Sequence, residues 1–165
     1  MEKLINNVLL TTEFTDEDIQ YSIKRHKEIF DSEFGFSEMF NKYVEKSITD
    51  FARDFDSKKD FMLVAKVDGR FAGTITLIGE EEGKGRLRYF FVEPFTRGHG
   101  VGKLVFTTAM SMAKEMGYSY LYFSTYNVLK VARTMYRQLG FEITQTIPDE
   151  DVAPGVIEEF WAKDI

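Results

Sequence analysis

Hydrophobic and polar residues follow two different periods along the chain, and the changes between them mark out helices and strands. The first 55 residues predict a strand over residues 7–14, then a helix that begins after Thr15 with acidic residues in its first turn and breaks at Gly35. A second helix begins after Ser37 and carries aromatic and aliphatic residues at helical spacing as far as Phe55. This part of the chain is therefore predicted to be a strand followed by two helices.

Three strands are predicted in the middle of the chain. The segments FMLVAKV and FAGTITLIG flank Asp68 and Gly69, and an Asp-Gly pair between two apolar runs is a strong sign of a hairpin. The charged turn EEEGKG at residues 80–85 leads into a further strand over residues 86–92. The pattern thus predicts a hairpin and a third strand.

Helices and strands alternate in the last part of the chain. An apolar face from Val101 to Met116 predicts a helix that ends at Gly117, and the strand YLYFSTY follows it. A second helix is predicted over residues 128–139 and stops at Gly140. Its apolar stripe consists of Val131, Ala132, Met135, Tyr136 and Leu139. The segments FEITQTI and GVIEEFWAK predict a last pair of strands.

The order of predicted elements is β-α-α-β-β-β-α-β-α-β-β. It is neither strictly alternating nor segregated, which indicates an α/β (α+β) fold with a mixed sheet and helices on both of its faces. The sequence has no internal repeat and no linker rich in proline, glycine or serine. We expect a single domain over residues 1–165.

Composition narrows the function classes. The net charge of −6 argues against nucleic acid as a partner, because such binding needs a basic face. The chain has no cysteine and only two histidines, which excludes disulfides, cysteine nucleophiles and thiolate zinc sites and argues against any metal. No signal peptide or run of about 20 apolar residues is present, so we expect a cytoplasmic protein that does not enter the membrane.

One segment stands out, RYFFVEPFTRGHGVGKLVF at residues 88–106, in which three glycines two residues apart lead directly into a helix. The N-terminus of a helix offers unpaired N–H groups and partial positive charge, which suit a phosphate. Glycines let a bulky anion approach these donors, and Arg97 adds a bidentate cationic donor. The segment therefore predicts a binding site for a phosphate-containing ligand.

Two familiar phosphate-binding motifs do not fit this segment. A P-loop requires glycine where Arg97 stands and a hydroxyl residue where Leu104 stands, so a nucleotide hydrolase is disfavoured. A dinucleotide fingerprint has its third glycine three residues after the second, whereas here Gly100 and Gly102 are two residues apart and lie late in the chain. The pattern that remains is Arg-x-x-Gly-x-Gly.

The segment VEPFTRGHGVGKLVFTTAM resembles motif A of the GNAT superfamily of acetyl-CoA-dependent N-acetyltransferases, and VARTMYRQLGFEI resembles its motif B. The order of elements is also similar, and the resemblance implies a GNAT fold with a mostly antiparallel sheet of about seven strands. The stretches RHKEIFDSEFGF and GRLRYFFVEP are similar, more narrowly, to GNAT domains fused behind a winged-helix regulator in some bacterial proteins.

The resemblance implies a set of contacts to coenzyme A. The residues implied at its pyrophosphate are Arg97, Gly98, His99, Gly100, Val101, Gly102 and Lys103. The preceding strand is implied to bind the pantetheine through the main chain of Phe91 and Val92. Many members carry an asparagine where this chain has Leu129, and Asn127, two residues earlier, is the candidate replacement.

The resemblance also implies catalytic residues. Tyr136 occupies the position of the family's general acid, and a phenol with a pKa of about 10 stays protonated at neutral pH. Some members carry a glutamate base where this chain has Arg86. The candidates that remain for the base are His26, Glu28 and Glu33, or an ordered chain of water molecules.

The function implied is an N-acetyltransferase that binds acetyl-CoA as a co-substrate, uses no metal, and lets a neutral primary amine attack the thioester directly. The acceptor is expected to be a small molecule or a peptide, and a homodimer is a possible assembly. The alternative is a GNAT module that binds an acyl-CoA as a sensor or partner domain without turnover. A thiol-release assay distinguishes the two.

Overall fold

The computed structural model describes residues 1–165, which form a single eight-stranded sheet with four α-helices. The strands are β1 (Glu2–Ile5), β2 (Val8–Thr11), β3 (Phe61–Val67), β4 (Arg70–Gly79), β5 (Lys84–Val92), β6 (Tyr120–Tyr126), β7 (Glu142–Pro148) and β8 (Ile157–Asp164). The helices are α1 (Asp16–Phe34), α2 (Glu38–Asp54), α3 (Val101–Glu115) and α4 (Lys130–Gln138), with one 3-10 turn at Pro94–Thr96. The strand order is β1-β2-β3-β4-β5-β6-β8-β7, and only the pair β5–β6 is parallel. The predicted mixed, mostly antiparallel sheet is confirmed.

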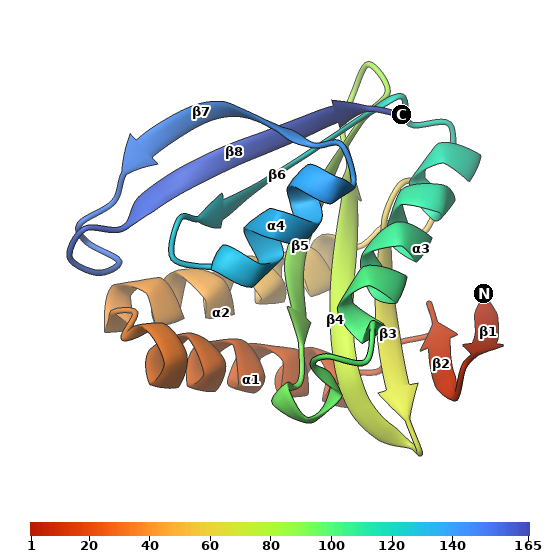
Figure 1. Cartoon of the computed structure of the whole chain (residues 1–165). Helices are drawn as coiled ribbons and strands as arrows, with labels where there is room; N and C mark the ends of the chain where they lie inside the picture. Colours follow the sequence, from red (N-terminus) through yellow and green to blue (C-terminus); the bar gives the residue numbers. More distant parts are fainter.

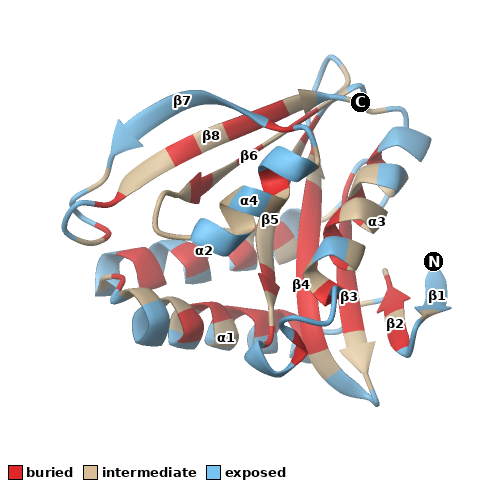
Figure 2. Cartoon of the chain, viewed as in Figure 1, coloured by how far each residue is buried: buried red, intermediate tan, exposed pale blue.

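The helices cover both faces of the sheet, as the sequence predicts. Helices α1 and α2 lie side by side on one face, and α3 and α4 lie on the other (Figure 1). Each layer has its own apolar cluster, which includes Ile23 and Val44 on the first side and Val105 and Phe106 on the second. Buried positions run along the central strands and the inner stripes of the helices (Figure 2). The sheet is thus the shared wall between two hydrophobic cores.

The boundaries of α1 and α2 follow from their capping residues. The Thr15 hydroxyl accepts from the Asp18 N–H, and the Asp18 carboxylate accepts from the Thr15 N–H, which completes a capping box. Gly35 ends α1 in the left-handed region, and the Ser37 hydroxyl accepts from the Phe40 N–H at the start of α2. None of the four helices is long and apolar enough to span a lipid bilayer.

Both ends of the chain differ from the prediction. The N-terminal segment is a hairpin of β1 and β2, joined at Asn6 and Asn7, which both have positive φ. Asparagine tolerates this conformation, so the pair makes a tight turn that the apolar pattern does not reveal. Near the other end, α4 begins at Lys130 rather than at residue 128, and Val131 is exposed (88%) instead of lying on the apolar stripe.

A β-bulge in β5 shapes the centre of the sheet. Thr74 pairs with Phe91 and Thr76 with Arg88, so two residues of β5 lie opposite one residue of β4. Tyr89, within the bulge, has a φ of 55°, which is uncommon for a residue with a side chain. On its other edge β5 pairs with β6 only over residues 84–86. Beyond the bulge, β5 and β6 are no longer paired.

Candidate active site

A cavity of about 760 Å³ lies where β5 and β6 part. Its walls come from α1, α2, β5, the loop before α3, the first two turns of α3, the end of β6, α4 and the start of β8. Most of the lining side chains are apolar. The glycine loop and Tyr136, which belong to the two separate sequence motifs, both line this cavity.

The glycine loop presents open backbone donors to the cavity. Gly98 and Gly100 have φ values of 79° and 77°, and a Cβ at either position would meet no atom within 4 Å. The backbone N–H groups of residues 98–103 make no hydrogen bond within the protein, and α3 has no side-chain cap. These donors and the positive end of the helix form an anion-binding arrangement.

Gly102 differs from its two neighbours. A Cβ here would point at β5, where it would lie 3.6 Å from Phe90 Cζ and 3.7 Å from the methyl groups of Val92. These are ordinary contact distances, so alanine fits but a branched side chain would press against the strand. The structure therefore places Gly102 where α3 packs on β5 and where a small residue fits.

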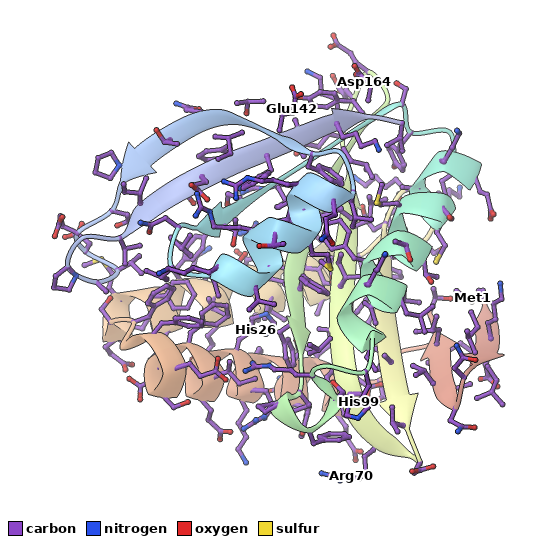
Figure 3. All side chains as sticks on the ribbon, viewed as in Figure 1. Met1, His26, Arg70, His99, Glu142 and Asp164 are labelled. Carbon is purple, nitrogen blue, oxygen red and sulfur yellow. The ribbon has the colours of Figure 1, made fainter.

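Cationic residues contribute to the wall of the cavity. Arg97, Lys103 and Lys130 all line the cavity, whereas His99 does not. His99 Nδ1 lies 3.0 Å from the Arg97 carbonyl oxygen, and His99 is exposed on the loop before α3 (Figure 3). Arg97 and Lys103, which belong to the loop and the first turn of α3, place positive charge beside a phosphate-containing ligand at this end of the cavity.

A buried ion pair fixes α1 against the start of the loop. Glu93 is 5% exposed and accepts from both Nε and NH2 of Arg25, at 2.7 and 2.8 Å. The Tyr21 hydroxyl donates to the same carboxylate at 3.0 Å. Bidentate arginine–carboxylate geometry is directional, so this contact sets the position of α1 relative to the loop.

Phe91 and Val92 lie in β5 beside the cavity. On one edge of β5 these two residues pair with Thr74 and Gly73 of β4. On the other edge they do not pair with β6. Their main-chain groups on that edge are therefore open to a ligand. The Phe91 side chain points instead into the core, where it meets the His26 ring edge-on with ring centroids 4.5 Å apart.

The Tyr136 side chain reaches the cavity from α4. It is 4% exposed and packs against the rings of Phe106, Phe123 and Trp161. Burial raises the pKa of its phenol well above the usual range, and Thr125 lowers it only in part. The phenol is thus protonated at neutral pH, as a proton donor must be.

The His26 side chain is buried between α1 and β5 and also lines the cavity (Figure 3). Its Nδ1–H donates to the Ser22 carbonyl oxygen at 2.8 Å, which leaves Nε2 as an acceptor. Nε2 is buried and has no hydrogen-bond partner. Burial lowers the pKa of His26 to about 4, so the ring is neutral at pH 7.

The other site residues predicted from the sequence have partners of their own. Glu33 lines the cavity and pairs with Arg97, which argues against its serving as the base. Glu28 pairs with Arg25 and Lys24 and does not line the cavity. Asn127 Oδ1 accepts from the Ile157 N–H at 2.9 Å, outside the cavity lining. That bond ties the end of β6 to β8 and leaves the coenzyme contact of Asn127 as a prediction.

Sequence reasoning missed part of the cavity, at the end remote from the loop. Arg86, Arg88, Tyr126 and Glu158 line the wall there. Glu158 lies opposite Tyr126 in the β6–β8 pairing. Burial raises the Tyr126 pKa, Glu158 adds to the rise, and Arg88 opposes it. No motif marks Glu158, whereas the alternation of arginines in RLR is visible in the sequence. No three His, Asp or Glu side chains gather as metal ligands in the structure.

Comparison with known proteins gives consistent matches. The profile of the Acetyltransferase (GNAT) family matches residues 23–141. The uncharacterized N-acetyltransferase YjgM of Escherichia coli (strain K12) is 37% identical over 70 residues, which cover 42% of this chain and 42% of that protein. The sequence match thus spans less than half of this relative's length.

Solved structures match over nearly the whole chain. An acetyltransferase of the GNAT family from Staphylococcus aureus Mu50 has a TM-score of 0.75 at 18% identity and covers 95% of this chain and 98% of that one. The ribosomal-protein-S18-alanine N-acetyltransferase of Escherichia coli has a TM-score of 0.70 at 16% identity, with coverage of 96% and 94%. At such identities these matches establish the shared fold.

Proposed function

Because the chain belongs to the GNAT family of acetyltransferases, we propose that it transfers the acetyl group of acetyl-CoA to a primary amine by direct attack. One observation carries the proposal, namely that residues 98 and 100–103, whose N–H groups have no partner, and the buried Tyr136 line one cavity. An acyl-CoA needs an anion site for its pyrophosphate and a proton donor near its sulfur. The residues of this chain fit both requirements.

The loop and β5 would hold the coenzyme. The N–H groups after Gly98 and Gly100 bind the pyrophosphate, and Arg97 and Lys103 add charge-assisted contacts. The open edge of β5 at Phe91 and Val92 binds the amides of the pantetheine arm. Acetyl-CoA supplies the reactive thioester, and these contacts direct it toward Tyr136.

The chemical step needs two proton movements. The acceptor ammonium first loses a proton, and its lone pair then forms a bond to the thioester carbon as the carbon–sulfur bond breaks. The Tyr136 hydroxyl donates its proton to the departing thiolate, and the second proton on nitrogen passes to solvent, from which Tyr136 is reprotonated. The products are an acetamide and coenzyme A.

His26 is not needed as the base that takes the first proton from the acceptor ammonium. A pKa of about 4 makes the imidazole a weak base for an ammonium whose pKa is far higher. Its free Nε2 fits a different task, which is to accept a hydrogen bond from a ligand N–H group and so fix its orientation. We propose that the proton leaves through water and that His26 is a positioning residue.

A thiol-release assay tests the proposed function. Purified protein, acetyl-CoA and a panel of primary amines should release coenzyme A in amounts equal to the acetamide formed, measured by mass spectrometry. Thermal stabilisation by acetyl-CoA is measured beside it. Stabilisation without thiol release for any amine would favour the binding-module alternative, and the absence of both would reject the coenzyme assignment.

A further inference from the structure

Two arginines project from β5 into the same part of the cavity. Arg86 and Arg88 are separated by Leu87, which is buried in the core under α3, so both arginines point to the opposite face of the sheet, toward α1 and α2. The bulge then turns Tyr89 to that face as well, where it packs with the cluster under α1 and α2. The cavity wall beneath α2 is therefore unusually cationic for a strand in the centre of a sheet.

Neither guanidinium has a carboxylate partner, although the chain carries 27 acidic against 21 basic residues. Arg25, Arg97 and Arg133 each form an ion pair, whereas Arg86 and Arg88 form none. Arg88 NH2 donates to the Tyr43 hydroxyl at 2.6 Å. The Nε of Arg86 is buried and has no acceptor at all. An unsatisfied buried donor on a cation is costly, which indicates that an acceptor from outside the protein completes it.

The arginines lie apart from the phosphate end of the cavity. Three residues lie between Arg88 and Val92, so at 3.3 Å per residue the strand advances by up to about 13 Å over these four steps, and by less because of the bulge at Tyr89. The coenzyme contacts proposed above therefore do not use these side chains. The only carboxylate that lines this end is Glu158, which can hold an ammonium group beside Tyr126.

We propose that the acceptor is a small amine that also carries a carboxylate, that Arg86 and Arg88 bind the carboxylate, and that Glu158 holds the ammonium. This inference rests on the proposed function and specifies its substrate class. A guanidinium binds a carboxylate through two parallel hydrogen bonds, and two guanidinium groups without carboxylate partners would repel a polyamine. An amino acid carries a carboxylate for the two arginines and an ammonium group for Glu158, so it matches both kinds of charge at this end of the cavity.

The test compares amines that carry an α-carboxylate with amines that lack it. Alanine, phenylalanine and glutamate are each compared with the α-carboxamide, and putrescine serves as the amine without acid. Thiol release is measured with the wild-type protein at saturating acetyl-CoA. The α-amine of a carboxamide is less basic and so more of it is neutral, which biases the assay against the proposal. We expect the amino acids to give the higher kcat/KM.

Arginine variants connect this preference to the site. Arg86→Gln and Arg88→Gln should each raise the KM for the preferred amino acid by about 10- to 100-fold, because a charge-assisted contact is lost. The KM for acetyl-CoA should stay unchanged. Arg53→Gln is the matched control, because this substitution removes the same charge from a residue of α2 that does not line the cavity. Arg88→Lys keeps the charge and should recover part of the loss.

The outcomes separate this proposal from the proposed function. Turnover of putrescine or the carboxamides at equal or better kcat/KM would overturn the acceptor assignment and leave the acetyltransferase intact. If no amine is turned over, NMR titration measures whether the same compounds bind to the complex of the protein with coenzyme A. If the amino acids bind to the wild-type complex and both Arg→Gln variants abolish this binding, the result would support a binding site at Arg86 and Arg88 without catalysis. Absence of binding, or binding that survives both substitutions, would overturn it.

Discussion

Arg97 NH1 lies 2.7 Å from Glu33 Oε1, which joins the glycine loop to the last turn of α1. Both side chains are partly exposed, at 43% and 31%. We propose above that Arg97 binds the pyrophosphate, and in this structure its guanidinium is instead held by a carboxylate of the protein. Coenzyme binding should therefore compete with this ion pair.

Glu33→Gln should strengthen acetyl-CoA binding. An exposed ion pair contributes about 0–1 kcal/mol, so its removal should lower the dissociation constant by up to about fivefold. Isothermal titration at low and moderate salt measures the change. Glu115→Gln removes the same charge at the far end of α3 and serves as the control. Weaker binding in the Glu33 variant would mean that Glu33 holds Arg97 in its binding orientation.

Gly100→Ala should abolish thermal stabilisation by acetyl-CoA. Its φ of 77° makes any side chain strained by about 1–2 kcal/mol, and the new methyl group would add bulk at a residue that lines the cavity, where the ligand is proposed to bind. Gly69→Ala is a matched control, because Gly69 has a φ of 76° and equally open surroundings in the β3–β4 turn. Both variants should lose similar stability. A full ligand-induced shift in folded Gly100→Ala would remove the loop from the coenzyme site.

Local chemistry accounts for what the sequence predicted well. The caps at Thr15 and Ser37, the break at Gly35 and the turn at Gly69 each have a short-range cause, and all lie where predicted. The two motifs likewise predicted the family, and the profile match over residues 23–141 confirms it. Residues that act through their neighbours in sequence are the ones that sequence reasoning finds.

Long-range pairing accounts for what could not be predicted. The bulge at Tyr89 depends on the register of β5 against β4, which no local pattern encodes. Glu158 reaches the cavity only because β8 pairs with β6, more than 30 residues away in the chain. Helical spacing predicts that Val131 lies on the apolar stripe, yet α4 begins only at Lys130 and the Val131 side chain is exposed. The ion pair of Glu33 with Arg97 likewise depends on how α1 packs.

The buried His26 should make stability depend on pH. Its pKa of about 4 in the folded protein is below the unfolded value of 6.5, so the unfolded state binds more protons in this range. Stability is therefore fully present above pH 6.5 and is lost as the pH falls toward 4. For this group alone, the loss between pH 7 and pH 5 is about 2 kcal/mol.

Urea denaturation at pH 7 and pH 5 measures this contribution. The asparagine in His26→Asn keeps a donor near the Ser22 carbonyl oxygen but does not titrate. Between pH 7 and pH 5 the free energy of unfolding of this variant should therefore fall by about 2 kcal/mol less than that of the wild type. His99→Asn, at the exposed loop, should behave as the wild type. Equal pH dependence in the His26 variant and the wild type would show that the buried imidazole does not titrate as described.

Tyr136→Phe should separate catalysis from binding. The ring contacts with Phe106, Phe123 and Trp161 are preserved, so stability and coenzyme affinity should change little. The variant loses only the hydroxyl, which is protonated at neutral pH because burial raises its pKa. General acid catalysis contributes about 10²–10⁴-fold, so kcat should fall by that order while the dissociation constant of acetyl-CoA stays constant. Tyr118→Phe, which removes a hydroxyl that donates to the Lys59 carbonyl oxygen outside the cavity, is the control and should keep its kcat. Wild-type turnover in Tyr136→Phe would mean that the thiolate leaves through water and that Tyr136 serves only the packing of α4 on the sheet.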